Sequence, residues 1–459
     1  PPLPSISAVP LYAIGRLSAR ITGSGDTTGV FFVSVFNQLT TAAACAVFFL
    51  VAAALGFTLR TALVLTVFFG AGTLALPYSR TFFGEPSASL MLLASILFII
   101  RFRQVGSNLM LLAAGCFLAL AVVSHYTSVL LFVPFAMYVW FISPHKKSDG
   151  AGQKILRLAT LALPCAIVFV LILFYNYARF GSPLQTGYEE RFNTPLFVGL
   201  HGLLFSPGKS IFIYCPLVLA FFPATAAFRK SHSAESKLFT ACAVIYLLIH
   251  AKWNLWGGDL SWGPRYLVPV VPMLILPLGA LLDAKSRTPR FIICNLQFAL
   301  HTPHYWLIFL FLLSFSVQII GISIDFKQYY DATYMTERPS LEKNDLTNFH
   351  PQYAPVAGHV RLMSFLLCRT VNGEKCSAPF FNPQNDPVIN DFLFNKLTPD
   401  LRIFLLQEKT QVERFLIRAS YVVALLFFIW TAFTLNRFNY ETKAIAASNQ
   451  KWKMVNGKR

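Results

Sequence analysis

Long apolar runs separated by short polar turns dominate the sequence and limit what the chain can fold into. Most of these runs have about 17–25 residues, the length that an α-helix needs to cross a hydrocarbon layer of about 30 Å. The alternating pattern of a membrane β-barrel is absent, and charged residues make up only 13% of the chain, against about 25% in a soluble domain. The sequence therefore predicts an all-α polytopic membrane protein with about eleven spans. The expected spans are residues 29–56, 61–78, 86–101, 108–124, 127–143, 155–177, 212–228, 238–252, 267–283, 303–323 and 416–436.

Lysine and arginine alternate between the two sets of loops. One set, together with the C-terminal tail, carries 19 Lys and Arg and only four acids. Because cytoplasmic loops of membrane proteins are rich in Lys and Arg, we expect this set to be cytoplasmic. The net charge of +18 then reflects membrane topology and attraction to membrane lipids. No nucleic-acid partner is expected, and the sequence does not indicate an oligomeric state.

This alternation divides the chain into five regions. Among the eight cysteines, Cys368 and Cys376 alone lie in a polar segment, which is expected outside the cytoplasm. A disulfide between them suits an oxidising compartment, although their spacing does not decide it. The opening PPLPSISAVPLYAIGRLSARITG is neither a signal peptide nor a complete span, so we expect an N-terminal portion before Pro1. The regions are an extracytoplasmic juxtamembrane segment (1–28), a ten-helix transmembrane core (29–323), an extracytoplasmic domain (324–415), the last transmembrane helix (416–436) and a basic cytoplasmic tail (437–459).

Polar residues that interrupt the apolar runs gather on the predicted outer side. In ALPYSRTFFGEPSASL, Arg80 and Glu85 lie at the mouth of a hairpin of two spans, and Pro86 favours the first turn of the second helix. Glu85 is then either a carboxylate at the positive end of that helix or a site residue. In the turn SHYTS, His125 either faces water or contacts a phosphate or hydroxyl group of a ligand.

Two further motifs combine glycine, a cation and aromatic residues where a span begins. In FSPGKSIFIYCP, Lys209 either holds an anion beside exposed backbone N–H groups or extends to the membrane interface. In WGGDLSWGPRY, Arg265 stands at the start of a span, where an arginine is costly unless it is paired, and its planar fork suits a phosphate. The two glycines allow close approach of a ligand. Asp259 is the second charged residue of this motif.

Together these motifs resemble the GT-C superfamily of membrane glycosyltransferases, which use polyprenyl-phosphate sugars. The resemblance covers roughly residues 5–285 and is strongest to the bacterial relatives of protein O-mannosyltransferases and of the aminoarabinose transferase that acts on lipid A. It rests on PLYAIGRL, TLALPYSRTFFGEPSASL, GLLFSPGKSIFIYCPL and WGGDLSWGPRYLVPVVP, of which the last two are the most specific.

The resemblance implies a sugar transferase that works at the extracytoplasmic face of a bacterial inner (plasma) membrane. In this family a carboxylate takes the proton of an acceptor hydroxyl, the sugar is transferred with inversion, and cations hold the leaving lipid phosphate. Carried over, Glu85 is the candidate catalytic residue. The candidate ligands of the donor phosphate are Arg265, Lys209 and Arg80. The candidate substrate contacts are His125, Tyr266, Tyr78 and Asp259.

The sequence departs from the family pattern at the catalytic acid. In the family this acid lies in the first outer loop, which would precede Pro1, and Asp26 is not its equivalent. Glu85 is therefore either the base or a supporting carboxylate, and Asp259 matches no acid of the family motif. No cofactor is expected, because cations of the protein can neutralise a lipid monophosphate. A divalent cation stays open, although no cluster of His, Cys and Asp has the spacing of metal ligands.

Three rival functions remain. A transporter or flippase has a similar number of spans, but its ionisable residues lie near the middle of the bilayer, whereas the middles of these spans are almost free of charge. A glycan polymerase or ligase would share the lipid-linked substrate and the outer face. A non-catalytic scaffold with a sensing outer domain is the third. Neither the sugar nor the acceptor, whether lipid, glycan or protein, follows from the sequence.

Overall fold

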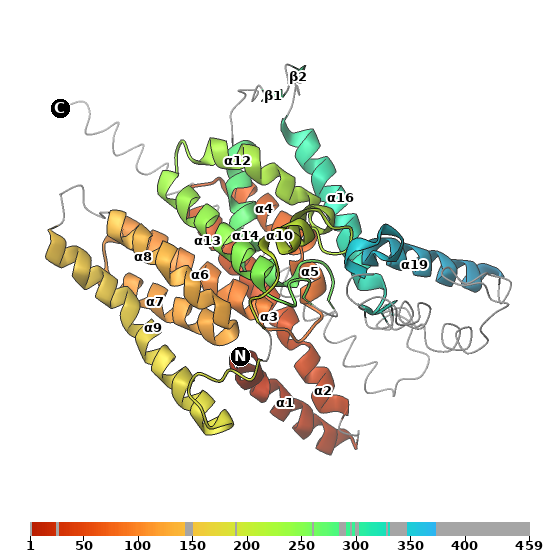
Figure 1. Ribbon diagram of the computed structural model, residues 1–459, viewed down its shortest axis with the longest axis horizontal. Coiled ribbons are helices and arrows are strands. Elements are labelled where there is room, and N and C mark those ends of the chain that lie inside the picture. Colours follow the sequence, from red (N-terminus) through yellow and green to blue (C-terminus); the bar gives the residue numbers. More distant parts are fainter. Residues whose placement is uncertain are drawn as a thin grey trace, which may run out of the picture. The chain divides into compact units, whose positions relative to one another are not determined.

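The structure is a computed structural model, and its described part is a bundle of apolar helices (Figure 1). It describes residues 2–23, 27–142, 150–188, 191–258, 261–283, 291–293, 296–298, 303–326, 329–330 and 347–372. The chain divides into the units Pro1–Asp400 and Leu401–Arg459, and all described residues belong to the first. The expected span 416–436 and the tail 437–459 lie outside the described residues, as does most of the expected domain 324–415.

The described elements follow one another with short connections. The first half of the chain holds α1 (Leu3–Thr22), α2 (Thr27–Ser34), α3 (Phe36–Ala54), α4 (Leu59–Gly72), α5 (Ala75–Tyr78), α6 (Glu85–Val105), α7 (Asn108–Ser124), the 3-10 helix η1 (Tyr126–Leu131), α8 (Phe132–Phe141), α9 (Ala151–Phe180), α10 (Leu196–Phe205) and α11 (Ile211–Tyr214). Then come η2 (Pro216–Ala220), α12 (Phe221–Phe228), α13 (Ser233–Lys252), η3 (Arg265–Val270), α14 (Val271–Ile275), η4 (Leu276–Leu278), α15 (Gly279–Leu282), the antiparallel pair β1 (Phe291–Ile293) and β2 (Leu296–Phe298), α16 (Pro303–Ser323), η5 (Pro351–Tyr353) and α19 (Pro355–Asn372).

The prediction of a helical membrane protein is confirmed. Within the described residues, six helices are long and apolar enough to cross a membrane, by length and composition. The other apolar helices there are shorter, so the count of eleven spans stays a prediction. The six candidate spans are Thr28–Ala54, Glu85–Val105, Ala151–Phe180, Ser233–Lys252, Arg265–Leu282 and Tyr305–Ser323.

Proline and glycine divide the apolar runs into these elements. The run from Arg265 to Leu282 alternates between 3-10 and α-helix, and Pro269, Pro272 and Pro277 each lack the N–H that a continuous α-helix uses. Gly106 follows the C-terminal end of α6. It has a φ of 74°, and its N–H donates a hydrogen bond to the carbonyl of Phe102, so the helix stops there.

Polar contacts join the helix ends on the side where the sequence predicts the cytoplasm. Arg103, near the end of α6, forms a salt bridge with Glu235 in the first turn of α13. Asp283, which follows α15, accepts hydrogen bonds from the backbone N–H of Thr58 (3.2 Å) and from the hydroxyl of Thr61 at the start of α4. These contacts bring loops with the same predicted location together at one end of the bundle.

We expect Arg103→Ala to destabilise the protein. Glu235 is buried (1% exposed) and accepts hydrogen bonds from Arg103 and from the Tyr138 hydroxyl (2.6 Å). The substitution therefore leaves a buried carboxylate without this cation. Because the Arg103 side chain is itself 43% exposed, the loss should be about 1–3 kcal/mol, below that of a fully buried pair. Thermal unfolding in detergent measures it, with Arg101→Ala, an exposed neighbour, as the matched control. Equal melting temperatures in the two variants would contradict the prediction.

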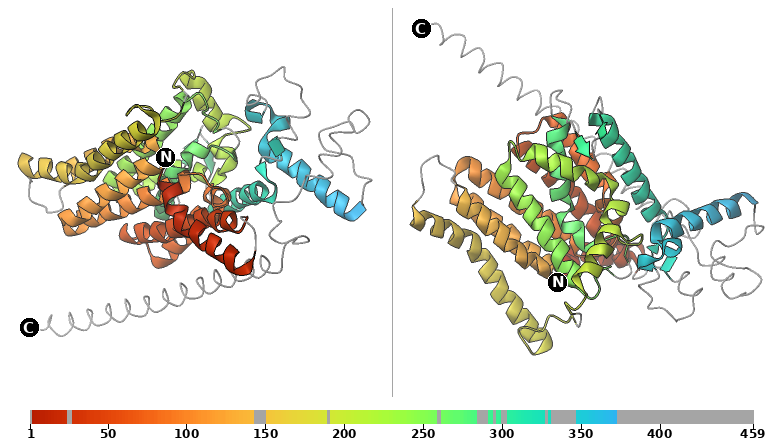
Figure 2. Two further views of the ribbon diagram at one scale, coloured as in Figure 1. Left: turned by 90° about the horizontal axis from the view of Figure 1, so that it is seen from below. Right: turned by 45° about the horizontal axis from the view of Figure 1, so that its top comes forward.

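The helices α6, α7 and α9 lie side by side (Figure 1). At Gly115 of α7 an added Cβ would meet the Leu161 carbonyl oxygen of α9 at 2.4 Å, so only glycine permits this close approach. α9 lies at an edge of the described helices in both views of Figure 2. In the most apolar 18-residue stretch of α9, only 11% is buried inside the protein, so most of the side chains there face outward.

Candidate functional site

An ion pair between Glu85 and Arg265 is the centre of the candidate site. Glu85 is the first residue of α6, and Arg265 is the first residue of η3, one and two residues before the expected starts of the spans 86–101 and 267–283. The Arg265 Nε atom lies 3.1 Å from Glu85 Oε1, and the two side chains are 15% and 5% exposed. A buried charge must be paired, and here each charge compensates the other.

Two glycine contacts position this pair. At Gly84, just before Glu85, an added Cβ would lie 2.6 Å from the Ser124 carbonyl oxygen, so the start of α6 touches the end of α7 backbone to backbone. Gly258 has a φ of 75°, and an added Cβ would lie 2.9 Å from Ser261 Oγ and 3.1 Å from Arg265 Cβ. The glycines therefore allow the two segments that carry the site to fold tightly against their neighbours.

Aromatic rings enclose the guanidinium group of Arg265. Its Cζ atom lies 4.4 Å from the centre of the Phe83 ring and 4.8 Å from that of Tyr266. The Arg265 Nη2 atom also donates a hydrogen bond to the Tyr266 hydroxyl (3.0 Å). These rings stabilise the cation and hold its plane, as a site for a flat or tetrahedral anion requires.

The structure brings His125 to the same site. Its Nε2 atom lies 3.9 Å from Glu85 Oε1, and its ring centre lies 6.0 Å from that of Tyr266. Burial, followed by the neighbouring His250 and Arg265, lowers the pKa of His125 well below its usual range. His125 is therefore neutral at physiological pH and can accept a hydrogen bond at one ring nitrogen.

Residues that sequence reasoning missed complete the surroundings of Glu85. His250, at the end of α13, stacks on Tyr266 with ring centres 4.9 Å apart, and Thr127 contacts both His125 and His250. Partial burial, followed by the charge of Glu85, raises the pKa of Tyr188 to about 12, so this tyrosine stays protonated near the site. Each is a single polar residue in an ordinary turn or helix, and only the fold shows that they converge.

Lys209 lies in a second cluster, which shares the loop before Arg265. The predicted turn is present, and Lys209 is buried (2% exposed), with its Nζ atom donating to the carbonyl oxygen of Ser261 (2.7 Å). The N–H of Gly208 donates to the Asn348 carbonyl (3.0 Å), so this N–H is engaged within the protein. Ser261 in turn donates to the Gly258 carbonyl (2.7 Å), which connects the cluster to the loop that carries Arg265.

Arg80 and Tyr78 bind different backbone carbonyls. Arg80 Nη1 donates to the Ile322 carbonyl (2.7 Å) near the end of α16, where a cation compensates the helix dipole. Tyr78 is buried, and its hydroxyl donates to the Trp262 carbonyl (2.9 Å), within electrostatic range of Arg265 and Glu85. Tyr78 thus supports the loop before Arg265, whereas this contact holds Arg80 against α16.

Asp259 and Cys376 lie outside the described residues. Cys368 is disulfide-bonded, and its pairing with Cys376 stays a prediction.

The loop before Arg265 also contacts a buried histidine of α19. The ring centres of Trp262 and His359 lie 4.7 Å apart, and His359 Nδ1 donates to the Ile320 carbonyl (3.2 Å). Burial lowers the pKa of His359 from its usual 6.5 to about 4.

We therefore expect His359 to make the fold sensitive to acid. The unfolded chain binds the proton more tightly than the folded protein, so stability is complete above pH 6.5 and is lost as the pH falls towards 4. Between pH 7 and pH 5 the loss from this group is about 2 kcal/mol. Thermal unfolding at both pH values measures it. The pH-dependent drop should shrink in His359→Phe but not in His350→Phe, which replaces an exposed histidine; equal drops would refute the prediction.

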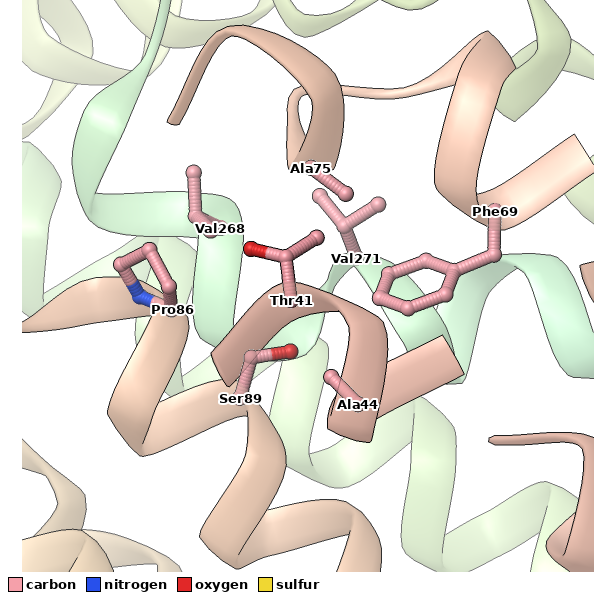
Figure 3. Close-up of a pocket in the computed structure, with 8 residues that line it drawn as sticks. All are labelled: Thr41, Ala44, Phe69, Ala75, Pro86, Ser89, Val268 and Val271. Carbon is pink, nitrogen blue, oxygen red and sulfur yellow. The ribbon is translucent and has the colours of Figure 1, made fainter. Parts of the chain in front are cut away.

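A small hollow is lined by residues of α3, α4, α5, α6, η3 and α14 (Figure 3). Its cavity volume is about 10 Å³, roughly the space that one water molecule needs. Most of its lining is apolar, and the hydroxyls of Thr41 and Ser89 are its polar groups. Pro86 and Val268, which line it, belong to the first turns that carry Glu85 and Arg265.

No group of three His, Cys, Asp or Glu residues that could hold a metal ion occurs among the residues that the structure describes. Comparison of the chain with protein-family models, with curated proteins and with solved structures found no match.

Proposed function

We propose that this protein is a membrane glycosyltransferase that moves a sugar from a polyprenyl-phosphate donor to a hydroxyl group of an acceptor. The observation that supports the proposal is the buried Glu85–Arg265 pair at two helix starts, because its carboxylate can accept a proton and its guanidinium group can bind a phosphate. The resemblance of the motifs around both residues to the GT-C superfamily supports the same activity.

In the proposed reaction the acceptor oxygen attacks the anomeric carbon of the sugar from the face opposite to the phosphate. The bond from this carbon to the phosphate oxygen breaks, and the phosphate leaves with the electron pair, so the configuration inverts. The proton of the acceptor hydroxyl passes to the Glu85 carboxylate. Arg265 stabilises the negative charge that grows on the phosphate, and the buried cation Lys209 adds positive potential from the far side of the loop.

The proposal places the site on the extracytoplasmic side of a bacterial inner membrane. It rests on the excess of Lys and Arg in the loops at the opposite end of the bundle, which favours the cytoplasm for that end. A lipid-linked sugar is a donor that does not require a nucleotide on this side. Arg80 and Asp259 keep the roles that the resemblance implies, as a further phosphate ligand and as a substrate contact.

Transfer of radiolabelled sugar from polyprenyl-phosphate donors tests the proposal. The full-length protein is reconstituted in liposomes with a panel of such donors and with membrane extract as the source of acceptors. Label that moves from the donor into acceptor material supports a transferase. Absence of transfer with every donor, combined with uptake or release of solute by the same liposomes, would replace the enzyme by a transporter.

A further inference from the structure

A chain of hydrogen bonds runs from a backbone carbonyl of α13 to His125. His250 Nδ1 lies 2.8 Å from the Tyr246 carbonyl oxygen, which only accepts, so this nitrogen donates. His250 is buried (2% exposed), where a charged imidazolium is costly, so it is neutral and its Nε2 atom accepts. The Thr127 hydroxyl, 3.3 Å from that Nε2 atom, is the donor to it.

The direction of these bonds fixes the tautomer of His125. Because the single proton of the Thr127 hydroxyl is used towards His250, its oxygen accepts from His125 Nδ1, which lies 2.7 Å away. The proton of the neutral His125 ring is therefore on Nδ1. Its Nε2 atom carries a lone pair and lies 3.9 Å from Glu85 Oε1.

Two hydrogen-bond acceptors therefore face each other across a short gap. A carboxylate and an imidazole lone pair do not bind each other, but both can bind a group that brings a proton. A hydroxyl of an acceptor substrate is such a group, whereas an ether, ester or carbonyl oxygen is not. The gap therefore favours a sugar-accepting substrate whose reacting group carries a proton for a hydrogen bond.

We infer that Thr127 and His250 are positioning residues that hold the Nε2 lone pair of His125 towards Glu85 during the transfer of the acceptor proton. This inference rests on the proposed function. When the O–H bond of the acceptor breaks and its oxygen bonds to the sugar, the proton moves to Glu85. The carboxylic acid so formed donates a hydrogen bond to His125 Nε2, which stabilises the protonated product of that step.

Replacement of the Thr127 hydroxyl by a methyl group tests the inference. Thr127→Val has nearly the same shape but cannot transmit the hydrogen bond, so kcat should fall about ten-fold or more while KM for the donor stays unchanged. Thr127→Ser restores the hydroxyl and should recover kcat. His250→Phe, which keeps the stacking on Tyr266, should lose as much kcat as Thr127→Val.

The outcomes separate this inference from the proposed function. If the wild type transfers sugar and Thr127→Val matches it in kcat, the positioning role is wrong and the transferase stands. If Thr127→Ser loses as much kcat as Thr127→Val, the hydroxyl is not the operative group and the inference also fails. If no wild-type preparation transfers sugar, the proposed function fails and takes the inference with it.

A spectroscopic measurement tests the tautomer without any turnover. Solid-state NMR of protein labelled with ¹⁵N-histidine in liposomes distinguishes the two neutral tautomers, and the His125 signals are identified by their loss in His125→Gln. We expect His125 to be protonated at Nδ1 in the wild type and a mixture of tautomers in Thr127→Val. A wild-type His125 protonated at Nε2 would overturn the inference.

Discussion

Arg265→Ala should reduce sugar transfer by about 10²–10³-fold at equal expression, which is the usual cost of losing one group that stabilises developing negative charge. In the structure this guanidinium is held by Glu85, Phe83 and Tyr266, so its direction is fixed before a phosphate arrives. Arg265→Lys keeps the charge but loses the planar fork, and we expect an intermediate rate. Initial rates of transfer in liposomes measure all three proteins.

The folding of Arg265→Ala needs its own control, because the substitution leaves Glu85 buried without its cation. Breaking a buried ion pair on one side costs about 3–5 kcal/mol, whereas removing both charges is far less harmful. The double variant Arg265→Ala with Glu85→Gln should therefore melt at a higher temperature than Arg265→Ala alone, yet remain inactive. Arg229→Ala, at an exposed arginine, is the matched control and should transfer normally. Normal transfer by well-folded Arg265→Ala would exclude the phosphate-binding role.

Glu85→Gln should lower kcat by about 10²–10⁴-fold, the range that general acid–base catalysis contributes. Glutamine keeps the size of the side chain but cannot take the proton of the acceptor hydroxyl. Binding of the donor should change little if the rings of Phe83 and Tyr266 hold Arg265 without its ion pair, and the melting temperature of Glu85→Gln checks the fold. Single-turnover rates separate these two effects, since they report the chemical step rather than binding.

An intermediate result for Glu85→Gln would also be informative. Loss of only a few-fold in kcat would mean that Glu85 supports Arg265 electrostatically and that another carboxylate is the base. Normal kcat together with a raised KM for the acceptor would limit Glu85 to substrate binding. Glu85→Asp, which retains the carboxylate on a shorter side chain, should keep part of the activity if Glu85 is the base.

The helical class and the grouping of Glu85, His125 and Arg265 were predictable from the sequence for a simple reason. Apolar runs of membrane-spanning length report helices directly, and the alternation of Lys and Arg assigns the loops between them to two sides. Glu85, His125 and Arg265 all lie in loops assigned to the same side, and the structure brings these three residues together. Pro86 marks the start of the helix that carries Glu85, and Pro264 directly precedes the 3-10 helix that begins at Arg265.

The sequence could not predict which polar residues face the site. That depends on how each helix is rotated about its axis and on contacts between distant segments. His250 follows an unbroken apolar stretch of α13, and nothing local distinguishes a histidine in the site from one in the core. Arg80 and Arg265 resemble each other in sequence context, yet Arg80 binds the end of α16. Lys209 reaches Ser261, which is 52 residues away along the chain. Such choices follow from packing, which no single motif encodes.

The outward-facing helix α9 has a consequence for handling the protein. Because only 11% of the apolar stretch of α9 is buried against the protein, most of its surface is expected to contact lipid. α9 packs closely on α7 at Gly115, and the loop that follows α9 carries Tyr188, which lies within electrostatic range of Glu85. We therefore expect the extraction medium to influence the surroundings of Glu85 through α9, so purified samples are best judged in a lipid bilayer rather than in micelles.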